Sequence, residues 1–202
     1  MIPVKAVLLL TAALALAGLL AEAGRRRLSK LHRKNRRTAR RLYRRLNRIA
    51  SQGSPDRGYA WIQNYLRQID PYVFEELVLA ALKEKGFSVR ANRKYSGDGG
   101  VDGRARKDGT RYYIQCKCYT GYASLADIRA FIDKCRKDRR KGFFVNTGLT
   151  SAKARETAEE SGIVAMICDE SLYNLIINEI HTTTIPGDAG QAGDRLLQAG
   201  ES

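Results

Sequence analysis

A carboxylate, an amide and an amine with complementary chemistry occur at Asp102, Gln115 and Lys117. Carboxylate and amide oxygens are ligands that Mg²⁺ accepts, and the backbone carbonyl of Cys116 would add a third oxygen. A metal held in this way lowers the pKa of a bound water and polarises a phosphoryl oxygen. Lys117 would orient that water or stabilise the negative charge that develops on the phosphate. These residues are therefore candidates for metal-assisted hydrolysis of a phosphate ester.

A turn between two predicted strands brings the carboxylate and the amide together. The Asp-Gly pair at residues 108–109 is a strong signal for a two-residue hairpin turn. With this turn, Lys107 pairs with Thr110. The same register, continued along both strands, predicts that Asp102 lies opposite Gln115 on one face of the sheet.

Alternation along the second strand separates polar from apolar side chains. Lys117 lies two residues beyond Gln115 and therefore projects from the same face. Ile114, Cys116 and Cys118 point the other way, toward the core. The polar side chains converge on one site, although an Asp, a Gln and a Lys on a sheet can also form only a solvated surface.

A fourth candidate lies on a helix predicted over residues 72–85, which Gly86 ends. Glu75 leans toward the apolar stripe of this helix, so its carboxylate could reach the sheet and complete the metal shell. Glu76 is expected to point nearer to solvent.

The remaining elements predict an α/β sandwich around a mixed sheet, because strands first pair as a hairpin and later alternate with helices. Ser124 and Asp127 resemble a capping box at the start of a helix that runs to about residue 139. The predicted strands are 87–91, 100–106, 111–119, 142–146 and 163–168, and further helices follow Thr150 and span 171–180.

Charge is concentrated near the N-terminus. Residues 25–48 contain thirteen Lys or Arg and no acidic residue, whereas the whole chain carries a net charge of +15. The rest of the chain therefore has a net charge of only +2, and bulk charge says little about its partner. The four cysteines lack the paired spacing of a zinc site and suit buried free thiols in a reducing compartment.

The first residues predict a membrane anchor. Residues 6–21 are apolar and uncharged, and residues 2–23 would reach about 33 Å as a helix, enough to cross a bilayer. A cleaved secretory signal is the alternative. The cations that follow resist translocation, so we favour an uncleaved transmembrane helix over residues 1–24 with the remainder in the cytoplasm.

The basic stretch predicts a cationic amphipathic helix over residues 25–50. Its cations, at residues 25–48, would contact an anionic membrane surface, and DNA phosphate is a second and compatible ligand. A Gly-Ser-Pro break then indicates a linker at residues 51–58. The compact domain is predicted over 59–181 and a disordered tail over 182–202.

Four ordered motifs stand out together: Phe74-Glu75, GDGGVD at residues 97–102, QCK at residues 115–117 and KGFFVNTG at residues 141–148. In this order they resemble the Mrr family of restriction endonucleases, a branch of the PD-(D/E)xK nuclease superfamily. The resemblance covers residues 71–180. It implies a restriction-endonuclease-like three-layer sandwich with a central mixed β-sheet, here preceded by the N-terminal transmembrane helix.

The resemblance also implies Mg²⁺-dependent hydrolysis of phosphodiester bonds in DNA. Asp102 would bind the metal, Gln115 would take the place of the superfamily's second acid, and Lys117 would be the catalytic lysine. Glu75 matches the acid of the first helix and would bind the metal with the Cys116 carbonyl. Gln in place of an acid removes one negative charge from the metal site.

Family members often act on foreign or modified DNA, but this chain has no room for the separate winged-helix recognition domain that some of them carry. A junction-resolving or repair nuclease of the same superfamily is one alternative function. A catalytically silent module that tethers DNA or a protein at the inner membrane is another. A homodimer would supply the two active sites that double-strand cleavage requires.

Overall fold

The computed structural model describes most of the chain between residues 30 and 177. The described ranges are residue 16, 30–52, 55–92 and 100–177. Apart from residue 16, the predicted anchor lies outside them, as do residues 97–99 of the GDGGVD motif and the predicted tail. Within the described ranges, no helix combines the length and the apolar character needed to cross a bilayer.

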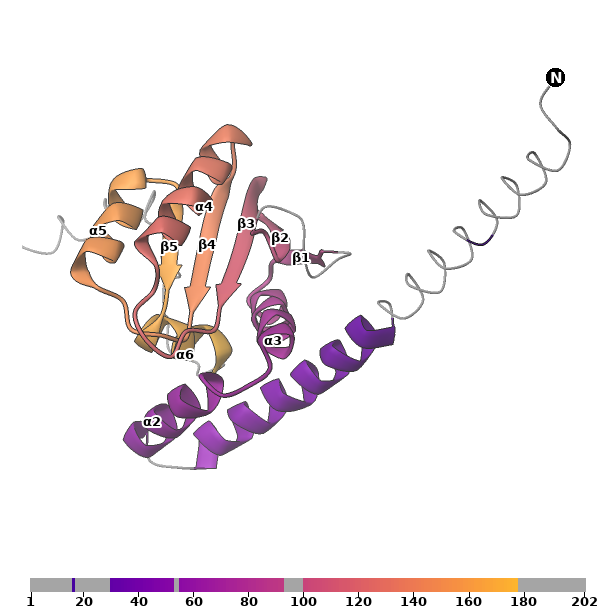
Figure 1. Ribbon diagram of the computed structural model, residues 1–202. Helices are drawn as coiled ribbons and strands as arrows, with labels where there is room; N and C mark the ends of the chain where they lie inside the picture. Colours follow the sequence, from indigo (N-terminus) through magenta and orange to yellow (C-terminus); the bar gives the residue numbers. More distant parts are fainter. Residues whose placement is uncertain (1–15, 17–29, 53–54, 93–99, 178–202) are drawn as a thin grey trace, which may run out of the picture.

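A five-stranded mixed sheet forms the centre of the domain, in the order β1-β2-β3-β4-β5 (Figure 1). β1 pairs with β2, and β2 with β3, in antiparallel orientation, whereas β3, β4 and β5 are parallel to one another. The mixed sheet of the sequence prediction is therefore confirmed. The strands are β1 (Ser88–Ala91), β2 (Gly103–Lys107), β3 (Thr110–Lys117), β4 (Lys141–Asn146) and β5 (Val164–Ile167).

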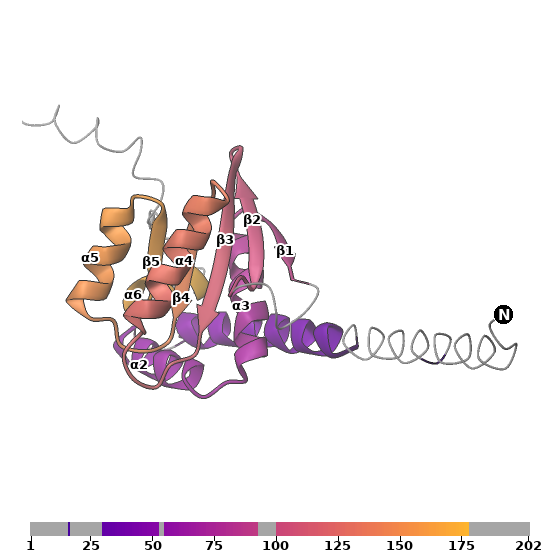
Figure 2. The same cartoon turned by 45° about the horizontal axis from the view of Figure 1, so that its top comes forward.

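Helices cover both faces of the sheet (Figures 1 and 2). The helices α2 (Pro55–Leu66), α3 (Pro71–Glu84) and α6 (Asp169–Ile176) share one apolar core with the sheet. The helices α4 (Leu125–Lys137) and α5 (Ala152–Ser161) form a second core on the opposite face. The sheet thus lies between two helical layers, as expected for an α/β sandwich.

Side chains of the central strand alternate between these two cores. Ile114 is fully buried in the core under α3, and the half-buried thiols of Cys116 and Cys118 pack against the same core. Tyr113 belongs to the core under α4 and α5. The prediction that the three apolar side chains share one face is therefore confirmed.

The β2–β3 hairpin has the predicted register. Lys107 pairs with Thr110, and the ladder runs back to Gly103 opposite Ile114. Asp108 and the glycine after it both have positive φ, at 48° and 79°, which is the backbone that a two-residue hairpin turn requires.

A helix over residues 30–52, hereafter helix 30–52, packs against the domain. It is the unlabelled helix that runs below the sheet in Figure 1. Its buried residues Ala39, Leu42 and Leu46 belong to the same core as α3, and Asn47 Nδ2 donates to the carbonyl of Ile176 at 3.0 Å. The helix continues through residue 52 and α2 begins at Pro55, so the break between them is shorter than the predicted linker.

The expectation that Glu76 points nearer to solvent is wrong. Its side chain is only 6% exposed, and Oε1 lies 3.4 Å from Nδ1 of His32. The reason is that α3 is covered by the sheet on one side and by helix 30–52 on another, so residues on both sides of α3 are buried. The packing of helix 30–52 was not predicted.

Candidate active site

Asp102 is fixed at the start of β2 by three hydrogen bonds. Its backbone N–H donates to the Ile114 carbonyl at 2.8 Å, and its carbonyl accepts from the N–H of Asn92 at 3.1 Å. The side-chain Oδ2 accepts from the N–H of Cys116 at 2.7 Å. The regular β2–β3 pairing ends at Gly103, the residue after Asp102. Asp102 therefore bonds to Ile114 and Cys116, on either side of Gln115, and not to Gln115 itself.

Gln115 carries a buried oxygen at the position in β3 that precedes Cys116. The side chain is 7% exposed, and Oε1 has no hydrogen-bond partner among the described residues. Gly100 has a φ of +80°, and a Cβ at this position would lie 2.5 Å from Nε2 of Gln115. Only glycine accommodates both the backbone conformation and this close approach. Gly100 therefore lies against the Gln115 amide, whose buried oxygen has no partner among the described residues.

Lys117 is held by an acidic residue from the opposite helical layer. Its Nζ lies 3.1 Å from Oδ2 of Asp127, in the first turn of α4. The Tyr119 hydroxyl donates to the same carboxylate oxygen, and the Tyr119 and Lys117 hydrogen bonds both lower the pKa of Asp127. Ser124 Oγ accepts from the Asp127 N–H at 3.2 Å, so Ser124 is the N-cap, while the Asp127 carboxylate of the predicted capping box contacts Lys117 and Tyr119 instead. The sequence indicated Asp127 only as part of that cap, so its contact with Lys117 was missed.

Asn146 is a further residue that sequence reasoning did not single out. It ends β4, where it pairs with Lys117, and it is completely buried. Its Nδ2 donates to Thr150 Oγ1 at 3.3 Å, but its Oδ1 has no partner among the described residues. A polar residue that ends an apolar strand within the KGFFVNTG motif was the available signal. The sheet therefore pairs Lys117 with a residue of β4 whose amide oxygen is buried and unpartnered.

Glu75 lies close enough to Asp102 for their charges to interact. Burial, followed by the negative charge of Asp102, raises the pKa of Glu75 to about 8. Burial also raises the pKa of Asp102 to about 6, against the opposing effects of the Cys116 N–H and the Lys117 charge. Two desolvated carboxyl groups near one another favour a cation that would stabilise both ionised forms.

The donor atoms at this site are oxygens. Asp102 and Glu75 would supply carboxylates and Gln115 its unpartnered Oε1, and the Cys116 carbonyl remains the predicted fourth ligand. Burial raises the pKa of Cys118 to about 12 and that of Cys116 well above its usual value, so both thiols stay protonated. The described residues contain no group of three or more His, Cys, Asp or Glu side chains arranged around a common point. This donor set suits a hard cation such as Mg²⁺ and does not suit zinc.

A family model described as a restriction endonuclease, the Mrr catalytic domain, matches residues 66–176, more than half of the chain. The chain belongs to the Mrr restriction endonuclease family. A search of curated proteins finds no match to the chain. The Mrr match begins at the last residue of α2 and ends at the last residue of α6, and it contains all four predicted site residues. Helix 30–52 precedes the Mrr match, although it shares the core of the domain.

Glu75→Gln is expected to stabilise the metal-free protein at alkaline pH and to change it little at acid pH. The pKa of Glu75 in the folded protein is about 8, above the ordinary value of 4.5, so the folded protein holds this proton more tightly than the unfolded chain. The resulting stabilisation is fully present below about pH 4.5 and is lost as the pH rises through about 8. Glutamine is never ionised, so the Glu75→Gln protein keeps its stability as the pH rises.

Urea unfolding of both proteins in EDTA measures this difference. The midpoint of Glu75→Gln should exceed that of the wild type increasingly between about pH 5 and about pH 9. Glu159→Gln, at an exposed position on α5, serves as the control and should follow the wild type. Midpoints of Glu75→Gln that run parallel to the wild type would contradict a desolvated Glu75.

Proposed function

We propose that the protein is a Mg²⁺-dependent DNA endonuclease that restricts foreign or modified DNA. Membership of the Mrr family supports the hydrolysis of DNA phosphodiester bonds. The observation that carries the metal requirement is the unpartnered Oε1 of Gln115, the residue next to Cys116, whose N–H binds the Asp102 carboxylate. A buried oxygen without a partner is costly, and a cation would satisfy it.

Each candidate residue would have a separate role. Asp102 and Gln115 would hold the metal, and Glu75 would complete its shell after losing its proton. Bound Mg²⁺ would supply a polarised phosphoryl oxygen and a water of lowered pKa. Lys117, with its ammonium oriented by Asp127, would align that water or stabilise the charge that develops on the phosphate.

Plasmid nicking by the full-length protein in detergent tests this proposal. A fragment that begins at residue 56 would lose the core residues of helix 30–52, so the full chain is required. We expect nicking with Mg²⁺, none in EDTA, and a loss of at least about 100-fold in both Asp102→Ala and Lys117→Ala. Linear plasmid that increases steeply with protein concentration would support the proposed homodimer.

Two exposed residues of α4 provide matched controls. Asp133→Ala and Lys137→Ala remove the same side chains at a distance from the site and should nick at the wild-type rate. The assay should include methylated, unmethylated, branched and single-stranded DNA. Absence of cleavage on every substrate would refute the endonuclease and favour the silent tethering module.

We also propose that residues 1–24 anchor the chain in the inner membrane with the nuclease domain in the cytoplasm. The support is the apolar, uncharged run at residues 6–21, followed by thirteen cations without an acid. In this topology, residues 25–48 would lie near the anionic cytoplasmic surface of the membrane.

A reporter enzyme fused to the C-terminus tests this topology. We expect activity from a reporter that functions only in the cytoplasm, and recovery of the fusion with the membrane fraction after a high-salt wash. Activity only from a periplasmic reporter would contradict the orientation, and release by salt would contradict the anchor.

A further inference from the structure

An arginine-lined groove lies between helix 30–52, α3 and the edge strand β1. It encloses about 420 Å³. Arg36, Arg40 and Arg44 line it from helix 30–52 at successive helical turns, about 6 Å apart along the axis. Lys83 of α3 adds a fourth cation, and Leu79 and Ala80 of the same helix contribute apolar lining. These residues are called the arginine groove below.

The cations of the arginine groove outnumber its acids. Glu76 and Glu84 also line it, but Glu76 already lies 3.4 Å from His32. Within the described ranges, none of the three arginines forms an ion pair with an acidic side chain. The groove therefore retains positive charge that an anion would neutralise.

Tyr43 gives a second indication of a ligand. This residue lines the arginine groove from helix 30–52, and its hydroxyl is buried without a hydrogen-bond partner among the described residues. Burial, followed by the charge of Glu84, raises the pKa of Tyr43, so the hydroxyl keeps its proton. A buried hydroxyl donor beside three arginines matches the acceptor oxygens of a phosphate.

The walls of the groove are connected to the candidate active site. Glu76 in α3 is the direct neighbour of Glu75. Ala91 in β1 precedes Asn92, whose backbone N–H donates to the Asp102 carbonyl at 3.1 Å and whose Nδ2 donates to the Val101 carbonyl. Figures 1 and 2 show β1 at the edge of the sheet on the side toward which helix 30–52 extends. The groove is therefore fixed relative to the metal site.

We propose that the arginine groove binds a backbone phosphate of the DNA outside the scissile bond, which positions the duplex at the active site. This inference rests on the proposed DNA substrate. Lipid headgroups fit less well, because helix 30–52 has its apolar residues Ala39, Leu42 and Leu46 buried in the domain and cannot insert them into a membrane. In addition, two of the groove walls belong to the catalytic domain.

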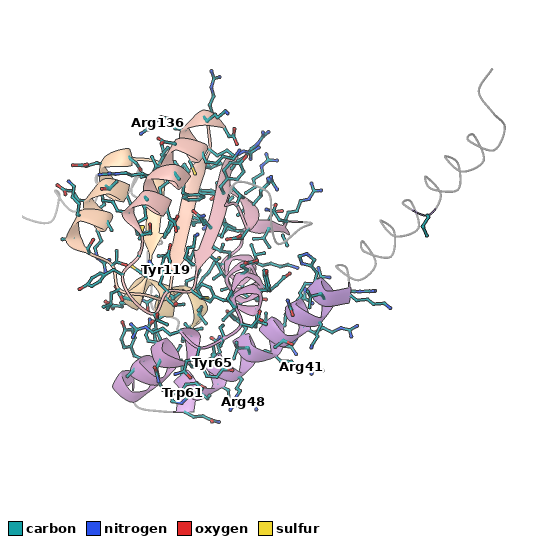
Figure 3. All side chains as sticks on the ribbon, viewed as in Figure 1. Arg41, Arg48, Trp61, Tyr65, Tyr119 and Arg136 are labelled. Atoms are coloured by element: carbon teal, nitrogen blue, oxygen red, sulfur yellow. The ribbon has the colours of Figure 1, made fainter. Side chains whose placement is uncertain are left out.

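Helix 30–52 offers a matched control in three arginines that face outward, away from its buried residues. Arg37, Arg41 and Arg48 are exposed and do not line the groove. Figure 3 shows Arg41 and Arg48 along the part of helix 30–52 that lies below the sheet. A triple Arg→Gln substitution at these positions removes the same charge from the same helix as a triple substitution at Arg36, Arg40 and Arg44.

The experiment measures binding of a fluorescent duplex to the full-length protein in phosphatidylcholine nanodiscs, in EDTA so that no metal-dependent cleavage interferes. The Arg36→Gln/Arg40→Gln/Arg44→Gln variant should bind at least about 10-fold more weakly than the wild type. Its dependence of log affinity on log salt should be shallower by about 1 to 3. Tyr43→Phe, which changes no charge, should weaken binding by roughly 2- to 5-fold, as expected for one lost hydrogen bond.

The triple variant at Arg37, Arg41 and Arg48 distinguishes DNA binding in the groove from nonspecific attraction to the positive charge of the helix. Arg37→Gln/Arg41→Gln/Arg48→Gln should stay within about 2-fold of the wild type, because its charges do not contact the bound phosphate. Equal losses in the two triple variants, or no loss in either, would overturn the proposal. Unfolding midpoints close to wild type would establish that all the variants fold.

A lipid site gives a different result. If the groove variant keeps its DNA affinity and only loses a preference for phosphatidylserine over phosphatidylcholine discs, the groove binds headgroups and the proposal is wrong. Normal nicking together with unchanged DNA binding by the groove variant would remove the groove proposal and leave the endonuclease intact. If the groove variant loses DNA binding and the wild type does not nick any substrate, the endonuclease proposal is wrong and the phosphate groove stands.

Discussion

The hydrogen bond from the Cys116 N–H to the Asp102 carboxylate is the contact on which the site depends. The regular pairing of β2 with β3 ends at Gly103, and Gly100, three residues before it, lies against the Gln115 side chain. The Asp102 side chain replaces a backbone acceptor at that point, so the carboxylate is fixed against the centre of β3. The same bond lowers the pKa of a carboxyl group that burial raises. One contact therefore sets both the position and the ionisation of Asp102.

The rest of the site follows from the cost of burying polar groups. Glu75 and Asp102 resist ionisation in the absence of a cation, and the oxygens of Gln115 and Asn146 have no partner among the described residues. Such groups are expensive in the metal-free protein, and a cation with oxygen ligands would offset that cost. Lys117 forms an ion pair with Asp127, and its charge also lowers the pKa of Asp102.

Local patterns were sufficient to predict the hairpin and the sheet face of each of its side chains. The Asp-Gly turn fixes the register, and alternation then assigns Gln115 and Ile114 to opposite faces. The exact position of Asp102 could not be predicted, because it depends on where the ladder ends. The contact of Asp127 with Lys117 joins two elements that no local pattern relates.

The packing of helix 30–52 was also beyond local patterns. Apolar residues at helical spacing beside many cations fit a membrane surface and a protein core equally well. The structure resolves this ambiguity for Leu42 and Leu46, which are buried against the domain. The same packing buries Glu76 and creates the arginine groove, so the sequence could indicate the charge of this helix but not the surface that its arginines form.

Mn²⁺ binding, measured by electron paramagnetic resonance, tests the central claim most directly, because Mn²⁺ accepts the same oxygen ligands as Mg²⁺ and is spectroscopically visible. The account predicts one site per chain in the wild type, no detectable site in Asp102→Asn, and affinity weakened at least about 10-fold in Gln115→Leu. Asp133→Asn should bind like the wild type. Unchanged Mn²⁺ binding in Asp102→Asn, or no binding by the wild type, would contradict the account.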